Sequence, residues 1–318
     1  MDIAHSPLCP AKLYAFELRL RPLQRGTLMP FSGELVHGAL LDWLRSAAPD
    51  VATWLHDGNK RRMFTCSSVQ FGLPEARMRE AERKNVHLPL EPEKTYTIRI
   101  TLLLGELFPL FYKALMHFNT AESGAEKPAF MHIAKQLFLL EEVVADNDVS
   151  GWTGFTSFGK LVEEAKSLRL GKVETLELEF GSLTTFNRAN KRSQVYGGHY
   201  ARVPMPQYVF PGLARRWQEL APSALAGVVQ TERIEQYIED DGIVINNYDL
   251  KPHQVYFTKH LQLGFVGMCR YDVRGPDEQV TEEAPLTVRQ QIVMLAQLAF
   301  YCGVGYKTAM GMGQVHLK

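Results

Sequence analysis

The sequence predicts an α+β protein, because segments with strand periodicity and segments with helix periodicity alternate along the chain. In the first half these segments come in the order strand, helix, strand, strand, helix, strand, and a similar order begins again near residue 173. This is the βαββαβ pattern of ferredoxin-like domains. We therefore expect two tandem ferredoxin-like (RRM-like) domains at residues 1–150 and 173–318, joined by a connector at 151–172, with a glycine-rich loop near the C-terminus.

The first strand is expected at residues 12–23, where Phe16 and Leu18 alternate with Glu17 and Arg19. Leucines at helical spacing over 35–47 predict a helix that Ser32 can cap, and a shorter helix is expected at 51–56. The remaining elements of this half are expected as strands at 64–71, 95–104 and 136–144 and a helix at 107–118. Residues 77–84 are highly charged, which predicts a solvated surface segment.

The second half begins with a predicted strand at 173–180, followed by a long basic loop at 186–204. A helix is expected at 210–220, and two or three strands at 242–250 and 255–271. The apolar face of residues 287–301 predicts a second helix, and residues 314–317 predict a closing strand. The connector is expected to carry a short helix of its own.

Composition indicates a globular protein in which any site for a polyanion must come from a local cluster of basic residues. The chain has 318 residues, of which 46% are hydrophobic and 22% charged, and its formal net charge is zero. Nucleic-acid-binding domains usually carry a basic excess, so here any such surface must come from clustering.

Cysteine placement and the N-terminal sequence predict a cytoplasmic protein. The four cysteines are scattered and form no C-x-x-C pair, which argues against zinc and is typical of a reducing compartment. The first residues have no secretory pattern, and the most apolar stretch, residues 100–116, is interrupted by Glu106, Pro109 and Lys113. We expect no membrane span, no metal site and no cofactor.

The most informative motif lies near the C-terminus, where Gly303 and Gly305 form one G-x-G pair and Gly311 and Gly313 another. Glycines permit positive φ angles and close backbone approach, so such a loop can offer N–H groups to phosphates. The G-K-[ST] ending of a mononucleotide P-loop is missing, and the loop follows a helix, unlike the dinucleotide fingerprint. A C-terminal glycine-rich hairpin without a ligand is the alternative interpretation.

Residues 56–62 combine side chains that suit phosphodiester cleavage. Histidine titrates near neutral pH, so His56 can transfer protons, and Lys60, Arg61 and Arg62 can stabilise charge on a phosphorane. Alternatively, His56 caps a short helix and the basic triplet is an ordinary solvated loop.

Three regions carry a resemblance to a known family. The glycine-rich loop after an apolar helix resembles that of RAMP-type CRISPR proteins. Residues 31–44 look like the first helix of the CRISPR repeat-cleaving endoribonucleases, the "Cas six" family. The run from 49 to 57, followed by 63–67, looks like its Leu-His and Phe-Thr-x-Ser signature, and 152–158 fits its connector. The resemblance covers nearly the whole chain in order.

The resemblance implies two ferredoxin-like domains and metal-independent cleavage of repeats in CRISPR precursor RNA. It implies attack by a 2′-hydroxyl, which leaves a 2′,3′-cyclic phosphate and a 5′-hydroxyl. His56 matches the family's general acid or base, and Arg62 matches the basic residue that follows it. Some members place a tyrosine in the first helix where this chain has Leu41, and His37, one turn earlier, is our candidate replacement. The expected partners are precursor and mature guide RNA and, beyond them, effector-complex subunits.

RNA affinity is expected from local patches. In the glycine loop, Tyr306 can stack on a base and Lys307 can neutralise phosphate. The basic loop supplies Arg188, Lys191 and Arg192. Each patch is by default an ordinary solvated surface.

Two other functions stay open at this point. One is a non-catalytic RAMP-type subunit that holds guide RNA in an effector complex, which would tolerate His56→Ala. The other is a small-molecule enzyme or regulator on the same scaffold, which would have a deep apolar pocket and no RNA affinity.

Overall fold

The computed structural model describes residues 12–47, 63–117, 129–188, 199–275, 280 and 285–318. They fall into two compact units. The first comprises Met1–Phe155 together with Val255–Leu261 and Ala309–Gly311. The second comprises Thr156–Gln254, Gln262–Thr308 and Met312–Lys318. The first unit's main span therefore ends inside the segment 151–172 that the sequence suggests as a connector.

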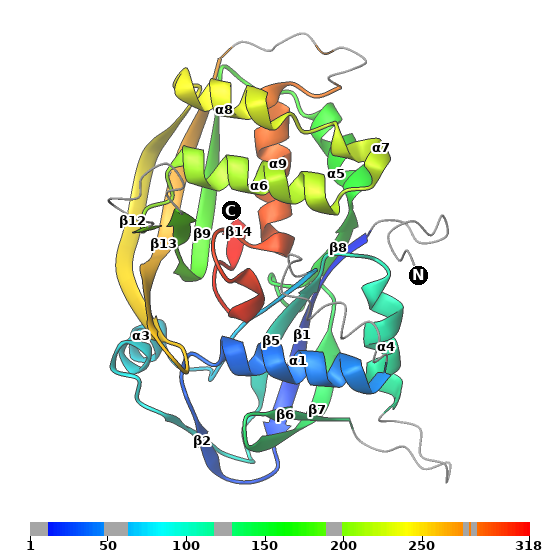
Figure 1. Cartoon of the computed structure of the whole chain (residues 1–318), viewed down its shortest axis with the longest axis vertical. Coiled ribbons are helices and arrows are strands. Elements are labelled where there is room, and N and C mark those ends of the chain that lie inside the picture. The colour runs from blue at the N-terminus through cyan, green and yellow to red at the C-terminus, as the bar shows by residue number, and fades with distance from the viewer. Residues whose placement is uncertain (1–11, 48–62, 118–128, 189–198, 276–279, 281–284) are drawn as a thin grey trace. The chain divides into compact units, whose positions relative to one another are not determined.

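The first unit is built on an antiparallel sheet with the strand order β3-β5-β1-β7-β6, of which β1, β5, β6 and β7 are labelled in Figure 1. Its strands are β1 (Lys12–Pro22), β3 (Phe64–Cys66), β5 (Tyr96–Leu102), β6 (Phe130–Ile133) and β7 (Gln136–Val144). Read across the sheet from β7, the main strands β7, β1, β5 and β3 are the fourth, first, third and second of the four in chain order. With α1 (Gly33–Ala47) and α4 (Leu107–His117) between them, they form the predicted βαββαβ arrangement.

The alternating pattern of β1 has the structural consequence that the sequence predicts. Leu18 and Leu20 are fully buried in the core, whereas Arg19 and Arg21 point to the other face. There they form ion pairs with β7, from Arg19 to Glu142 at 2.6 Å and from Arg21 to Glu141 at 2.5 Å. The buried face of the sheet is covered by α1 and α4, which pack against each other; the ring of Phe111 on α4 stacks on Phe16.

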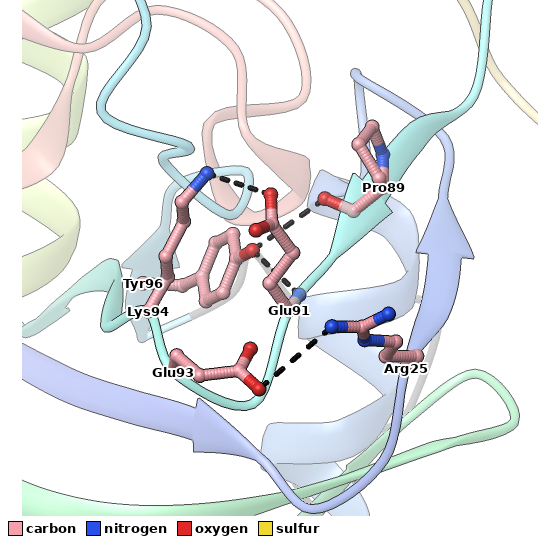
Figure 2. Close-up of polar contacts among 6 residues, drawn as sticks. All are labelled: Arg25, Pro89, Glu91, Glu93, Lys94 and Tyr96. Atoms are coloured by element: carbon pink, nitrogen blue, oxygen red, sulfur yellow. Dashed lines mark hydrogen bonds and ion pairs between the residues drawn. The ribbon is translucent and has the colours of Figure 1, made fainter.

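A small ribbon of β2 (Gly26–Leu28) and β4 (Leu88–Leu90) extends this unit, and Figure 2 shows the polar contacts that fix the turn into β5. The buried Tyr96 hydroxyl accepts a hydrogen bond from the Glu91 amide at 3.0 Å. Lys94 pairs with the Glu91 carboxylate at 2.6 Å. The ion pair is exposed and contributes little to stability. The hydrogen bond to the buried Tyr96 hydroxyl is therefore the contact that mainly stabilises the turn.

The charged segment at 77–84 is solvated, as expected, but it is also helical. Helix α3 (Glu75–Lys84) has Ala81 as its one buried residue. Pairs four residues apart, Glu75 with Arg79 and Glu80 with Lys84, support the helix on its exposed face. Sequence reasoning missed it because no apolar stripe marks a helix whose side chains are almost all in solvent.

The second unit repeats the arrangement with the sheet order β12-β13-β9-β14. Its strands are β9 (Val173–Thr184), β12 (Ile243–Tyr256), β13 (Leu261–Arg274) and β14 (Val315–Leu317). Helix α9 (Val288–Cys302) packs against β9 and β14 on one side and against α5 (Phe158–Ser167) and α6 (Pro206–Leu220) on the other (Figure 1). This unit also contains α7 (Ser223–Ala226) and α8 (Thr231–Glu239), whereas β8 (Gly154–Ser157) and the 3-10 turn η2 (Thr308–Met310) each contain a boundary between the two units.

One part of the predicted basic loop at 186–204 is regular structure. Strands β10 (Phe186–Arg188) and β11 (His199–Ala201) form an antiparallel pair. The tandem ferredoxin-like fold predicted from the sequence is thus confirmed. No helix in the described part of the chain is long and apolar enough to cross a membrane.

Candidate nucleic-acid interface

Several residues singled out from the sequence lie outside the described residues. These are His56, Lys60, Arg61 and Arg62 in the first half and Lys191 and Arg192 in the second. Their roles stay predictions. The described candidates are His37, Arg188, Tyr306, Lys307 and the four loop glycines.

His37 is held in the first unit by the beginning of α1. Ser32, just before the helix, accepts a hydrogen bond from the Val69 amide at 2.9 Å and donates its own amide to Ser68 Oγ at 3.1 Å. These reciprocal bonds fix the helix start against the segment after β3. One turn later, the His37 ring stacks on Phe64 of β3 with centroids 5.2 Å apart.

The polar contact of His37 is with the glycine-rich segment. Its Nδ1 lies 2.8 Å from the carbonyl oxygen of Ala309, so Nδ1 carries the proton and donates. The thiol of Cys66 donates to the same carbonyl at 3.1 Å. The His37 side chain is only 6% exposed. This geometry holds residues 309–311 to α1 and commits Nδ1 of His37 to the Ala309 carbonyl, and the catalytic role of His37 stays a prediction.

Close backbone approach explains two of the glycines in this unit. A Cβ on Gly33 would lie 2.3 Å from the carbonyl oxygen of Met310, and one on Gly311 would lie 2.9 Å from the Gly33 Cα. Gly311 also has a φ of +89°, which disfavours other residues. Burial raises the pKa of the Cys66 thiol well above its usual range, so this neighbour stays a neutral donor.

In the second unit, the other glycines fit the loop to the end of β9. Gly305 has a φ of +88°, and a Cβ there would lie 2.5 Å from the Thr185 carbonyl oxygen. The next amide, that of Tyr306, donates to this same oxygen at 2.9 Å. The Gly313 amide donates to Leu183 at 2.9 Å and its carbonyl accepts from Val304 at 2.8 Å. These amides are thus committed to the protein and do not form a phosphate nest.

Side chains of the loop face the β10–β11 pair. The ring of Tyr306 lies 5.7 Å from that of Tyr200 on β11. The Lys307 ammonium lies 5.5 Å from the Tyr306 ring centroid. On β10, the Arg188 guanidinium lies 4.8 Å from the ring centroid of Tyr208, on the first turn of α6. The structure therefore joins each described basic candidate to an aromatic ring, a combination that suits RNA bases and phosphates.

Comparison with known families finds one model that matches part of this chain. Residues 178–315 match the model of the CRISPR-associated endoribonuclease Cas6 family. This part of the chain is similar to that family. It contains the described basic and aromatic candidates and all four loop glycines. Among curated proteins, no sequence relative matches the chain.

Solved Cas6 structures share the fold over the whole chain. A Cas6 product complex has a TM-score of 0.67 at 21% identity, covering 97% of this chain and all of that one. Thermus thermophilus Cas6 gives a TM-score of 0.62 at 21% identity, covering 98% of this chain and 100% of that one. A second Cas6 protein in a product complex gives 0.61 at 21% identity, covering 96% and 99%.

Sequence reasoning missed the contribution of Tyr200 and Tyr208. Tyr200 lies within the predicted basic loop at 186–204, and Tyr208 lies just before the helix predicted at 210–220. Gly197 and Gly198 before His199 are a turn signal that could have indicated a hairpin. Among the described residues, no group of three or more His, Cys, Asp and Glu side chains lies close enough together to hold a metal ion.

Proposed function

We propose that this chain is an endoribonuclease that cuts CRISPR precursor RNA within its repeats to give guide RNA. The observation that carries the proposal is the match of residues 178–315 to the Cas6 family, combined with a Cas6-like fold over the whole chain. Two of the similar structures are described as Cas6 product complexes, which is consistent with RNA as the ligand of this fold.

The proposed reaction is a metal-independent transesterification. A base takes the proton of the 2′-hydroxyl, whose oxygen attacks the adjacent phosphorus. The bond from phosphorus to the 5′-oxygen breaks, and an acid protonates that oxygen. The products are a 2′,3′-cyclic phosphate and a 5′-hydroxyl. We assign one proton transfer to His56, charge stabilisation to Arg62, and the second proton transfer to His37.

The test is cleavage of labelled repeat RNA in EDTA, with a second substrate that carries a 2′-deoxy at the cut site. We expect cutting of the first substrate only, and loss of about 100-fold or more in rate for His56→Ala. Product ends are read by mass spectrometry. Cutting of the 2′-deoxy substrate would refute the mechanism.

A pair of His37 variants separates proton transfer from positioning. His37→Asn can keep an N–H donor toward the Ala309 carbonyl but cannot act as an acid or base near neutral pH. If His37 transfers a proton, His37→Asn loses as much cleavage rate as His37→Ala. If it only holds residues 309–311, His37→Asn keeps most of the rate and His37→Ala loses it together with thermal stability.

A non-catalytic subunit that holds guide RNA is the second candidate, and Leu41 in place of a tyrosine favours it. Tight binding of both substrates without cutting would support this alternative.

A further inference from the structure

The antiparallel pair of β10 and β11 presents its side chains to two opposite faces. Because side chains alternate along a strand, Phe186 and Arg188 lie on one face and Asn187 on the other. The register pairs Asn187 with Tyr200, so Tyr200 shares the face opposite to Arg188. The Phe186 and Arg188 face is occupied by Tyr208, whose ring lies 5.7 Å from that of Phe186. The Tyr200 face is the one that meets the glycine loop.

Thr185 forms hydrogen bonds with both segments that carry the tyrosines of this face. The Thr185 carbonyl accepts the Tyr306 amide at 2.9 Å, and the Thr185 hydroxyl donates to the Ala201 carbonyl at 3.1 Å. Thr185 itself is fully buried. Tyr200 and Tyr306 are therefore brought together by backbone contacts on a rigid support, which lowers the ordering cost of binding a ligand on them.

Neither ring of the Tyr200–Tyr306 pair is fully buried in the protein. Tyr200 is 41% exposed, and Tyr306 is partly exposed. Their planes meet at 45°, so the rings do not stack on each other. Partial burial, with Tyr200 as a further cause, raises the pKa of Tyr306, so the Tyr306 hydroxyl is neutral at physiological pH. Lys307, next to Tyr306, has a left-handed φ of +56°, and its ammonium lies near the Tyr306 ring.

We propose that Tyr200 and Tyr306 form a stacking site for one unpaired nucleotide of RNA, whose phosphate is neutralised by Lys307. The proposal rests on the proposed function, because it takes RNA as the ligand. A ring stacks on the flat face of a base, and proteins reach that face mainly on bases splayed out in single-stranded loops, bulges and ends, so we take the nucleotide to be single-stranded. Stacking is tolerant of base identity, so the site positions the strand rather than reading its sequence.

The test measures binding of cleavage-resistant 2′-deoxy repeat RNA by fluorescence anisotropy. Tyr200→Ala and Tyr306→Ala should each weaken binding about 5- to 150-fold, whereas the corresponding Phe variants should stay within about twofold of the wild type. Tyr248→Ala is the matched control, since Tyr248 is a 66% exposed tyrosine on β12 of the same unit. Thermal melts of all variants report any loss of folding.

Two further readouts locate the nucleotide. With 2-aminopurine placed in turn along the unpaired part of the RNA, one position should be quenched by the wild type and recover with Tyr200→Ala. Lys307→Gln should reduce the slope of log affinity against log salt by about 0.7, whereas Tyr200→Ala should leave the slope unchanged.

The outcomes separate this site from the proposed reaction. If the wild type binds RNA without cutting it, and Tyr200→Ala weakens that binding, the proposed reaction is refuted and the stacking site is supported. Cleavage and binding that are equal in wild type and Tyr200→Ala, with no recovered 2-aminopurine position, would overturn the site and leave the reaction standing. A wild type that binds no RNA would overturn both.

Discussion

Replacing Gly313 by alanine tests whether the glycine loop is shaped by contacts within the protein. Gly313 has a φ of +67°, and a Cβ there would lie 2.1 Å from the carbonyl oxygen of Val304. That oxygen belongs to backbone, so it cannot swing aside as the end of a flexible side chain would. The loop must open to relieve the clash.

The expected cost has two parts. An alanine in the left-handed region costs about 1–2 kcal/mol. Opening the loop also breaks the hydrogen bonds from Val304 to Gly313 at 2.8 Å and from Gly313 to Leu183 at 2.9 Å, at about 1 kcal/mol each. The free energy of unfolding should therefore fall by about 3–4 kcal/mol.

Urea unfolding followed by circular dichroism measures this loss, and Gly72→Ala is the matched control. Gly72 has nearly the same φ, +64°, but a Cβ there would meet nothing within 4 Å. It should lose only the conformational part, about 1–2 kcal/mol. Equal losses in the two variants would refute the reasoning, because the contact with Val304 would then carry no cost.

Three further predictions concern stability and thiol chemistry. Gly212→Ala inside α6 should raise the free energy of unfolding by about 0.5–1 kcal/mol, because a Cβ there meets nothing within 4 Å; an unchanged or lower urea midpoint would contradict this. Thr287→Ala should lower it by about 1 kcal/mol through loss of the capping box with Gln290, and an unchanged midpoint would count against that cap. Burial raises the pKa of Cys302 to about 12, so iodoacetamide at pH 8 should label it far faster in the unfolded protein than in the native one, as read by mass spectrometry. The Cys302 thiol keeps its proton to higher pH in the native state than in the unfolded state. The free energy of unfolding should therefore fall as pH rises above about 9, by up to about 1.4 kcal/mol per pH unit. Cys302→Ala should make this pH dependence less steep.

The sequence predicted the sheets well because their signals are local. Alternation along β1 and the apolar face of α9 each follow from side-chain periodicity, and both elements lie where these patterns predict them. Helix α3 was not predicted, because exposed ion pairs rather than an apolar stripe stabilise it.

The candidate interface was less predictable because it depends on contacts between distant segments. Tyr306 follows Tyr200 by more than a hundred residues, and their pairing depends on hydrogen bonds of Thr185 with both neighbourhoods. Likewise, nothing near His37 in sequence indicates that its partner is the Ala309 carbonyl. Spacing identified Tyr306 and His37 as chemically useful residues, but only the fold assigns their partners.

The contacts of the glycine loop divide its residues into two classes with different expected phenotypes. A Cβ at Gly305 or Gly313 would lie too close to a backbone oxygen for any side chain to fit there. The nearby amides donate hydrogen bonds within the protein. Substitution of either glycine should therefore appear first in unfolding. The Tyr306 ring lies beside the exposed Tyr200 ring, and the Lys307 ammonium lies near the Tyr306 ring, so their substitution should appear in RNA affinity at unchanged stability. A loop whose glycines bound phosphate directly would give the opposite result, with weaker binding and little loss of stability in Gly305→Ala.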